Sequence, residues 1–384
     1  MNYYKESLKF HRKNRGKIEL KSKMNIKGKD DLSIAYTPGV AEPCREIYKN
    51  PEKVYEYTPK GNMVAVISDG SAVLGLGNIG CLASIPVMEG KAMLFKEFAG
   101  IDAFPITLDT NNIEEIVNTI KVISPSFGGI NLEDISAPKC IEIERKLKEK
   151  LDIPVFHDDQ HGTAIVVLAG LINSLKLINK NIEDIKIVVN GIGAAGGAII
   201  RLLIKMGAKN IVPCDINGIL AEEQELDFNK KEILELTNPN KERGDLARAL
   251  QNADVFIGVS AANIVDEVMI KSMRDSPIVF AMANPEPEIM PDIAKRAGVR
   301  VIATGRSDFP NQINNVLAFP GIFKGALEIR AKEITDDMKI KAAYAIAGIA
   351  MEDGITEEYI IPKPLDKRVV DKVSKAVKDS LKEV

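Results

Sequence analysis

The chain has 384 residues, of which 45% are hydrophobic and 27% charged, and its formal net charge is −3. This length is too great for one typical hydrophobic core and predicts about two domains, while the average composition excludes disorder on a large scale. The balanced charge gives no reason to expect nucleic acid or an anionic membrane as a partner.

The first 30 residues have a polar, helical pattern, and Pro38-Gly39 marks a turn after them. Short apolar runs then alternate with helical patterns. Strands are predicted over 63–68, 102–107, 129–132 and 154–156, and helices over 86–98, 113–123, 137–151 and 162–179.

A second unit begins near residue 185. Its predicted elements are a strand at 187–189, a glycine turn, a helix at 198–206, a strand from 211, strands at 255–259, 278–281 and 301–302, and a mainly helical tail from 322. This alternation predicts an α/β fold with a doubly wound parallel sheet. We expect one domain over 1–155 and a second over 156–384, and the tail could fold back on the first.

The sequence shows no secretory signal, no stretch long enough to span a membrane and no closely spaced cysteine pair, and these features bear on the cellular compartment. The Lys- and Arg-rich start lacks the apolar core of a secretory signal, and the apolar stretch at 164–172 is far shorter than the ~20 residues of a membrane span. The cysteines are widely spaced, at positions 44, 81, 140 and 214, without a C-x-x-C pair. We therefore expect a cytoplasmic protein with reduced thiols.

A glycine-rich turn follows the strand at 187–189 and opens a helix. It reads Asn190-Gly191-Ile192-Gly193-Ala194-Ala195-Gly196 and contains G-x-G-x-x-G. In this context the glycines allow a pyrophosphate to approach the backbone at the helix N-terminus, so the turn predicts a nicotinamide dinucleotide site and an oxidoreductase. Asp215 ends the next strand, where an acid normally binds the ribose of NAD. Asp215 favours NAD over NADP, but a nearby Lys or Arg could override it, so the cofactor is open.

Acidic residues follow two predicted strands of the first domain. Glu133 and Asp134 end the strand at 129–132, and Asp158 and Asp159 follow the strand at 154–156. Ligands collect at such strand ends, and carboxylates suit Mg²⁺ or Mn²⁺. The alternative is that Asp158 or Asp159 only caps a helix that starts at Gly162. Spacing alone does not decide between these readings.

His157 and His161 are four residues apart and could in principle hold zinc. They lack the glutamate of an H-E-x-x-H motif and any evident thiol partner. We therefore expect both to be packing residues.

Eight segments, in order, resemble the malic enzymes, specifically their short prokaryotic form. They are SIAYTPGVAEPC (33–44), SDGSAVLGLGNIG (68–80), MEGKAMLFKEFAGIDA (88–103), NLEDISAPKC (131–140), PVFHDDQHGTA (154–164), NGIGAAGGA (190–198), ANPEPEI (283–289) and FPNQINNVLAFPGIFKGA (309–326). The resemblance covers roughly residues 30–330. It implies an N-terminal α/β domain of the malic-enzyme type and a Rossmann-like NAD(P)-binding domain with a helical tail.

The resemblance also implies an activity, which is oxidative decarboxylation of L-malate to pyruvate and CO₂ with NAD or NADP and with Mg²⁺ or Mn²⁺. By motif position, Tyr36 is the general acid and Lys91 the general base. The family further suggests a homodimer or larger homo-oligomer. The remaining roles implied are metal ligands at Glu133, Asp134 and Asp159, with Asp158 beside them, and contacts to substrate or to the nicotinamide end at Asn284 and Asn315.

The chemistry needs these residue types. A lysine takes a hydroxyl proton only when it is neutral, and its ordinary pKa is about 10.4, so burial or a nearby cation must lower that pKa. A divalent metal beside Lys91 would repel the ammonium and would also acidify the hydroxyl. A tyrosine can then protonate C3 once CO₂ has left.

One departure concerns the malate carboxylate. Larger malic enzymes hold it with an arginine before G-L-G, where this chain reads Ser71-Ala72-Val73-Leu74. We expect Ser71, backbone amides or Asn315 to hold the carboxylate instead.

Two other functions remain possible from the sequence. One is a dehydrogenase that oxidises another 2-hydroxy acid without decarboxylation, and the other is a redox-inactive protein that senses a dinucleotide. The three carboxylates argue against the first, and Tyr36 with Lys91 argues against the second. Tyr36 stands far from the other motifs, so it could serve its own site or that of a partner subunit.

Overall fold

The computed structural model describes residues 2–73 and 75–380 and contains two sheets. The first has the strand order β2-β1-β3-β4, and the second β10-β9-β8-β5-β6-β7. Neighbouring strands pair in parallel, except β7, which is antiparallel to β6. The strands are β1 (Met63–Ser68), β2 (Asp102–Thr107), β3 (Gly129–Leu132), β4 (Val155–His157), β5 (Lys186–Asn190), β6 (Asn210–Asp215), β7 (Gly218–Ile219), β8 (Val255–Gly258), β9 (Ile278–Ala281) and β10 (Val301–Thr304).

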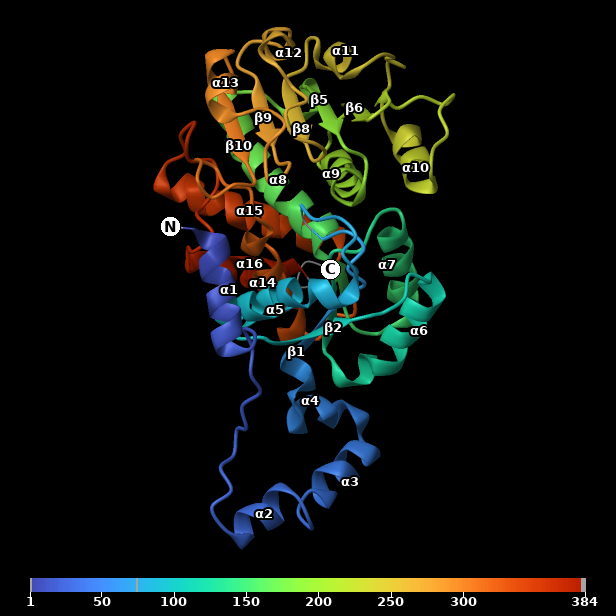
Figure 1. The fold of residues 1–384 in the computed structure, drawn as a ribbon, viewed down its shortest axis with the longest axis vertical. Helices are drawn as coiled ribbons and strands as arrows, with labels where there is room; N and C mark the ends of the chain where they lie inside the picture. Colours follow the sequence, from blue (N-terminus) through green and yellow to red (C-terminus); the bar gives the residue numbers. More distant parts are fainter. Residues whose placement is uncertain (1, 74, 381–384) are drawn as a thin grey trace.

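Helices cover both sheets (Figure 1). The α-helices are α1 (Tyr3–Asn14), α2 (Lys29–Ala35), α3 (Ala41–Lys49), α4 (Val54–Tyr57), α5 (Gly80–Ala99), α6 (Ile113–Ile123), α7 (Lys139–Lys150), α8 (Asp158–Ile178), α9 (Ala194–Lys205), α10 (Phe228–Leu236), α11 (Leu246–Leu250), α12 (Glu267–Lys271), α13 (Pro291–Arg296), α14 (Phe319–Glu328), α15 (Asp336–Asp353) and α16 (Arg368–Asp379). A short 3₁₀ segment, η5 (Asn315–Leu317), precedes α14.

Strand β1 lies inside the first sheet, and its alternating side chains are buried on both faces. Val64 and Val66 belong to the core that contains α5 and α14, whereas Ala65 and Ile67 belong to the core with α6 and α7. This explains why β1 is a continuous apolar run. The sheet therefore forms a rigid layer from whose edge loops carry the polar side chains described below.

The C-terminal helices fold back on the first sheet, as expected. Phe319 of α14 lies 4.7 Å from Phe95 of α5, measured between ring centroids. Phe323 lies 5.2 Å from Phe95 and 5.8 Å from Phe156 of β4. The tail thus forms part of the core beneath the first sheet.

Helix α8 joins the two sheets. It is the one helix in the described residues whose length and composition would allow it to cross a membrane, but two thirds of that stretch is buried inside the protein. The apolar character of α8 therefore reflects its place in the core, between α9 and α15.

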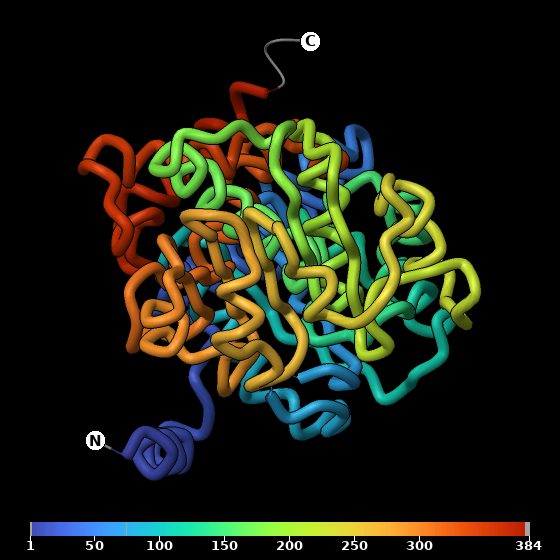
Figure 2. Tube along the Cα trace, turned by 90° about the horizontal axis from the view of Figure 1, so that it is seen from above, coloured from blue at the N-terminus to red at the C-terminus, as the bar shows by residue number. Residues whose placement is uncertain are grey.

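The N-terminal segment is less helical than its sequence predicts. The helix expected over the first 30 residues ends at Asn14, because Arg15 and Gly16 adopt left-handed backbone angles with φ of 55° and 111°. Lys17 then fastens the chain to α5 through its backbone N–H and Glu89 Oε2, which are 3.2 Å apart. Helix α1 stands off from the body (Figure 2) and contains no buried residue.

Three predicted helix starts are also wrong by four residues or more. Helix α9 begins at Ala194 rather than at residue 198. Helix α5 begins at Gly80 rather than at residue 86, so Pro86 lies inside it. Helix α8 begins at Asp158 rather than at Gly162, with His157 as its N-cap. All three helices therefore begin closer to the functional loops that precede them.

Candidate active site

Three acidic side chains meet where two strands of the first sheet end. Glu133 and Asp134 follow β3, and Asp159 lies in the first turn of α8, directly after β4. The strands are parallel neighbours, so their carboxyl ends lie at one edge of the sheet. One carboxylate oxygen of each residue lies within 4.8 Å of those of the other two. The structure thus brings the three predicted metal ligands together.

A turn of the backbone aims two consecutive acids at the same place. Asp134 has a φ of 53°, in the left-handed region that aspartate tolerates better than most residues. In a continuing strand, neighbouring side chains would point to opposite faces. The N–H of Asp134 donates to Asp159 Oδ2 over 2.8 Å, which ties this turn to the start of α8.

Lys91 lies between two carboxylates. Its side chain projects from α5, is 8% exposed, and places Nζ 2.8 Å from Glu133 Oε1 and 2.6 Å from Asp158 Oδ2. The ammonium group also lies 4.3 Å from the centroid of the Phe319 ring. Because α8 already begins at Asp158, neither Asp158 nor Asp159 caps a helix starting at Gly162, and that alternative is wrong.

Buried carboxyl groups at this edge outnumber the single ammonium group of Lys91. Burial raises the pKa of Asp158, with Lys91 opposing and Glu133 reinforcing the change. Burial also raises the pKa values of Glu133 and Asp159. Burial lowers the pKa of Lys91, but Asp158 and Glu133 reverse this and hold it above its ordinary value. Lys91 is therefore an ammonium ion here, and further positive charge would stabilise the cluster.

The donor set fits a hard divalent cation. Glu133, Asp134 and Asp159 offer only carboxylate oxygens, which Mg²⁺ and Mn²⁺ prefer. His161 points elsewhere, with Nε2 2.8 Å from Glu144 Oε1, and this agrees with its expected role as a packing residue.

The loop after β1 approaches the acidic cluster. The N–H of Ala72 donates to the carbonyl oxygen of Asp134 over 2.9 Å. The Ser71 hydroxyl donates to Asp69 Oδ1 over 2.6 Å and accepts from the N–H of Ser136 over 2.9 Å. Ser71 is therefore beside the site but bonded within the protein. Leu74, at the end of the segment that lacks the arginine, is outside the described residues.

The two predicted asparagines come from the second half of the chain. Asn315 opens η5 beside α8, and its Cβ is 3.2 Å from where a Cβ on Gly162 would stand. Asn284 follows β9, and its Nδ2 is 2.9 Å from the Cβ position of Gly305. The Asn284 carbonyl oxygen is 3.9 Å from the Cβ position of Gly75. Loops from both sheets thus approach one another near the cluster.

The glycine turn has the form that a dinucleotide site requires. Gly191 has a φ of 103°, and a Cβ there would lie 2.6 Å from the carbonyl oxygen of Val259. A Cβ on Gly196 would overlap the carbonyl oxygen of Gly191. Gly193 instead faces open space and is the N-cap of α9, leaving room for a phosphate at the N–H groups that begin this helix.

Asp215 is more heavily engaged than the sequence indicates. Its Oδ1 accepts from the N–H of Asn217 over 2.8 Å, and its Oδ2 lies 2.7 Å from Lys230 Nζ. Lys230 is therefore a basic residue close enough to Asp215 to offset the preference of that acid for NAD over NADP. The neighbouring Ile216 is 98% exposed, so an apolar surface lies beside the predicted ribose position.

Tyr36 is not brought to the cluster of its own chain. It ends α2, and its side chain is 67% exposed. Figure 1 shows α2 and α3 projecting at one end of the longest axis of the molecule, away from α5 and α8. We call residues 18–50 the N-terminal arm.

Two supporting residues are absent from the predicted set. Asn131 Nδ2 donates to Glu133 Oε2 over 2.9 Å from within β3. Glu288 is fully buried, and its carboxylate accepts from the N–H groups of Ser260 and Ala283, each over 3.0 Å. Asn131 is a polar residue inside an otherwise apolar strand, and this pattern could have indicated a role at the site. Glu288 lies in the ANPEPEI segment, whose prolines and glutamates are typical of an exposed loop. The sequence therefore gives no sign that Glu288 is buried.

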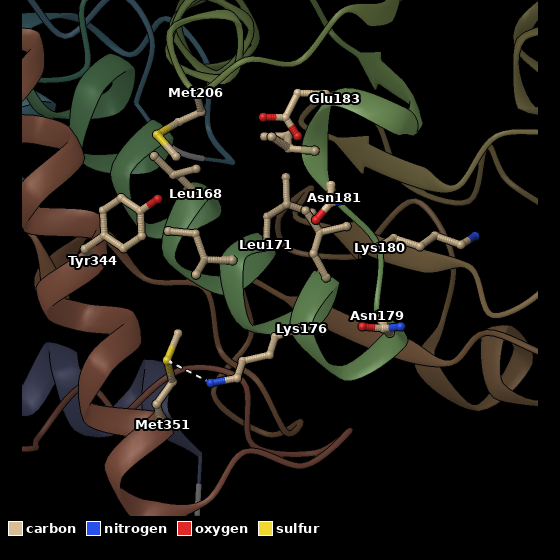
Figure 3. Close-up of a pocket in the computed structure, with 13 residues that line it drawn as sticks. Leu168, Leu171, Lys176, Asn179, Lys180, Asn181, Glu183, Met206, Tyr344 and Met351 are labelled. Atoms are coloured by element: carbon tan, nitrogen blue, oxygen red, sulfur yellow. Dashed lines mark hydrogen bonds between the residues drawn. The ribbon is translucent and has the colours of Figure 1, made fainter.

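A cavity of about 420 Å³ lies elsewhere, near the other end of α8 (Figure 3). Its walls include Leu168, Leu171 and Met206, and Tyr344 and Lys176 also line it. It contains none of the predicted site residues. The acidic cluster, rather than this cavity, is the candidate active site.

Comparison with known families assigns both parts of the chain. The family model for the N-terminal domain of malic enzymes matches residues 13–114 and 110–148. The model for the NAD binding domain of malic enzymes matches residues 160–382.

Individual relatives agree with this assignment. The chain is 58% identical to the NAD-dependent malic enzyme of Geobacillus stearothermophilus over 363 residues, which is 94% of this chain and 76% of that protein. It is 56% identical to the bifunctional malic/malolactic enzyme of Bacillus subtilis over 379 residues, covering 98% and 92% of the two chains. The crystal structure of an NAD-dependent malic enzyme from Thermotoga maritima superposes with a TM-score of 0.94 at 52% identity, over 97% of this chain and 98% of that one.

Proposed function

The chain belongs to the malic enzyme family, and from this membership we infer that it oxidises L-malate and releases CO₂ as it reduces NAD⁺ or NADP⁺. The observation that carries the assignment to this site is the meeting of Lys91 with Glu133, Asp134 and Asp159 at one sheet edge. The first sheet carries the acidic cluster with Lys91, where malate would react. The second sheet carries the glycine turn, where the dinucleotide would bind.

We propose that Lys91 takes the proton of the malate C2 hydroxyl while the C2 hydride passes to the nicotinamide ring. Lys91 is held as an ammonium ion by Glu133 and Asp158, so it acts as a base only when their charge is balanced from elsewhere. A divalent cation on Glu133, Asp134 and Asp159 would supply that balance, acidify the hydroxyl and stabilise the charge that develops as CO₂ leaves. Phe319 and the buried strand ends exclude water from the Lys91 ammonium.

The product balance tests this function. Malate, Mn²⁺ and either NAD⁺ or NADP⁺ are expected to give pyruvate, CO₂ and reduced cofactor in equal amounts. Both cofactors belong in the assay because Lys230 balances the charge of Asp215. Reduced cofactor with oxaloacetate and no CO₂ would identify a non-decarboxylating dehydrogenase. Dinucleotide binding without any reduction would identify a redox-inactive protein.

We propose further that the protein is a cytoplasmic homodimer in which each arm covers the site of the partner. The N-terminal arm exposes many large apolar side chains, a surface that a second copy would bury. Tyr36 would then protonate C3 of the product in the partner site rather than in its own. The exposed apolar residues are Leu20, Met24, Ile26, Leu32, Ile34, Tyr36, Val40 and Tyr48.

Mixing two inactive variants tests the exchange of Tyr36. Tyr36→Phe and Lys91→Ala homodimers are each expected to be nearly inactive. If the arms exchange, a heterodimer has one site with both native residues and one with neither, so unfolding and refolding the variants together restores about a quarter of wild-type activity for random pairing. If each chain uses its own Tyr36, every site in the mixture lacks one residue and no activity returns.

A further inference from the structure

A buried glutamate outside the acidic cluster contacts the turn that carries Asp158 and Asp159. Glu144 lies on α7 and is 4% exposed. On this helix it occupies the same face as the buried Cys140 and Leu147, where an apolar residue would be expected. A carboxylate placed there costs free energy of desolvation unless specific partners satisfy it.

Those partners come from both sides of the metal-ligand turn. Glu144 Oε1 and Oε2 lie 2.8 and 2.9 Å from His161 Nε2. The backbone N–H of His157 and the Nε2 of Gln160 donate to the same carboxylate, each over 3.4 Å. The contacts therefore bracket Asp158 and Asp159 in sequence, with His157 before them and Gln160 and His161 after them.

The charge of Glu144 is maintained by its surroundings. Lys148 Nζ lies 2.9 Å from Oε1, one helical turn along α7. Burial opposes ionisation of Glu144, but His161 and Lys148 hold its pKa well below its ordinary value. Since a carboxylate only accepts, Nε2 of His161 carries the ring proton and donates it.

We propose that Glu144 is a positioning residue that fixes the first turn of α8 so that Asp159 binds the metal and Asp158 meets Lys91. This role rests on the metal site of the proposed function. Glu144 does not touch the predicted metal or substrate, and it acts through the backbone and side chains on either side of the two aspartates. Partners of this kind set the orientation of metal ligands, and their loss typically weakens metal binding about 10- to 100-fold.

Glu144→Gln tests the role because it keeps the size of the side chain but turns one acceptor into a donor. The Kd for Mn²⁺, measured by electron paramagnetic resonance on the folded full-length protein, is expected to rise at least about 10-fold. The Kd for NAD⁺ is expected to stay unchanged, since the glycine turn lies on the other sheet. Glu142→Gln is the matched control, because Glu142 lies on the same helix but is 39% exposed and pairs with Lys146.

The outcomes separate this role from the metal site itself. If the wild type binds Mn²⁺ and Glu144→Gln binds it equally well, Glu144 only stabilises the fold, even if the melting temperature falls. If the wild type binds no Mn²⁺, both the metal site and the positioning role are wrong. Should Glu144→Gln not fold, His161→Phe keeps an aromatic ring but removes the donor closest to Glu144, and an unchanged Kd for Mn²⁺ in that variant would equally overturn the proposal.

Discussion

Replacing Lys91 with alanine is expected to lower kcat for malate oxidation by about 10³-fold, which is within the range that one general base contributes. Lys91 is buried and projects into the acidic cluster, whereas the glycine turn belongs to the other sheet. Binding of NAD⁺ or NADP⁺ is therefore expected to be unchanged. Steady-state rates and dinucleotide titrations measure the two effects separately.

The same replacement has a second expected effect, which concerns charge. Without Lys91, Glu133 and Asp158 lose their buried partner, so the metal-free protein is expected to be less stable. Because the ammonium no longer competes for Glu133, the affinity for Mn²⁺ is expected to be retained or increased. A small primary amine added to the assay is expected to restore part of the rate by occupying the vacated space.

Lys96→Ala is the matched control for Lys91. Lys96 lies on the same helix, but its side chain is 58% exposed and pairs with Asp102. An exposed pair of this kind contributes little, so near-normal rates are expected. Turnover by Lys91→Ala close to that of the control would remove Lys91 as the base.

Much of the fold could be predicted because buried parallel strands are short apolar runs bounded by turn residues. The predicted bounds of β1, β2, β3 and β9 agree with the structure. The two-residue β7 has no such pattern and was missed. The sequence predicts α5 only from Pro86, because proline is typical of a helix start, but here Pro86 lies inside the helix.

The sequence predicts which residues form the candidate site, but it does not predict which of them contact one another. Ends of parallel strands lie at one edge, so the proximity of Glu133 and Asp159 follows from the order of elements. The pairing of Lys91 with Asp158 depends on how α5 lies on the sheet, which no local pattern encodes. The position of Tyr36 on a projecting arm depends on the path of residues 18–50, and the helical pattern of the first 30 residues does not predict that path.

Replacing Asp159 with asparagine is expected to abolish most malate oxidation by removing one ligand charge. The amide oxygen can still accept the N–H of Asp134, so the turn that ties β3 to α8 is expected to persist. The loss in Mn²⁺ affinity should exceed the roughly 10- to 100-fold typical of residues that only support a ligand. Asp152→Asn is the control, because the Asp152 side chain is 91% exposed.

Mn²⁺ binding by the wild type and Asp159→Asn, followed by electron paramagnetic resonance together with malate oxidation before and after chelation, tests the central claim most directly. The wild type is expected to bind one Mn²⁺ per chain in the presence of malate and to lose activity when the metal is removed. Asp159→Asn is expected to bind Mn²⁺ more than about 100-fold more weakly. Equal affinity in the two proteins, or malate oxidation that survives chelation, would contradict a metal site at Glu133, Asp134 and Asp159.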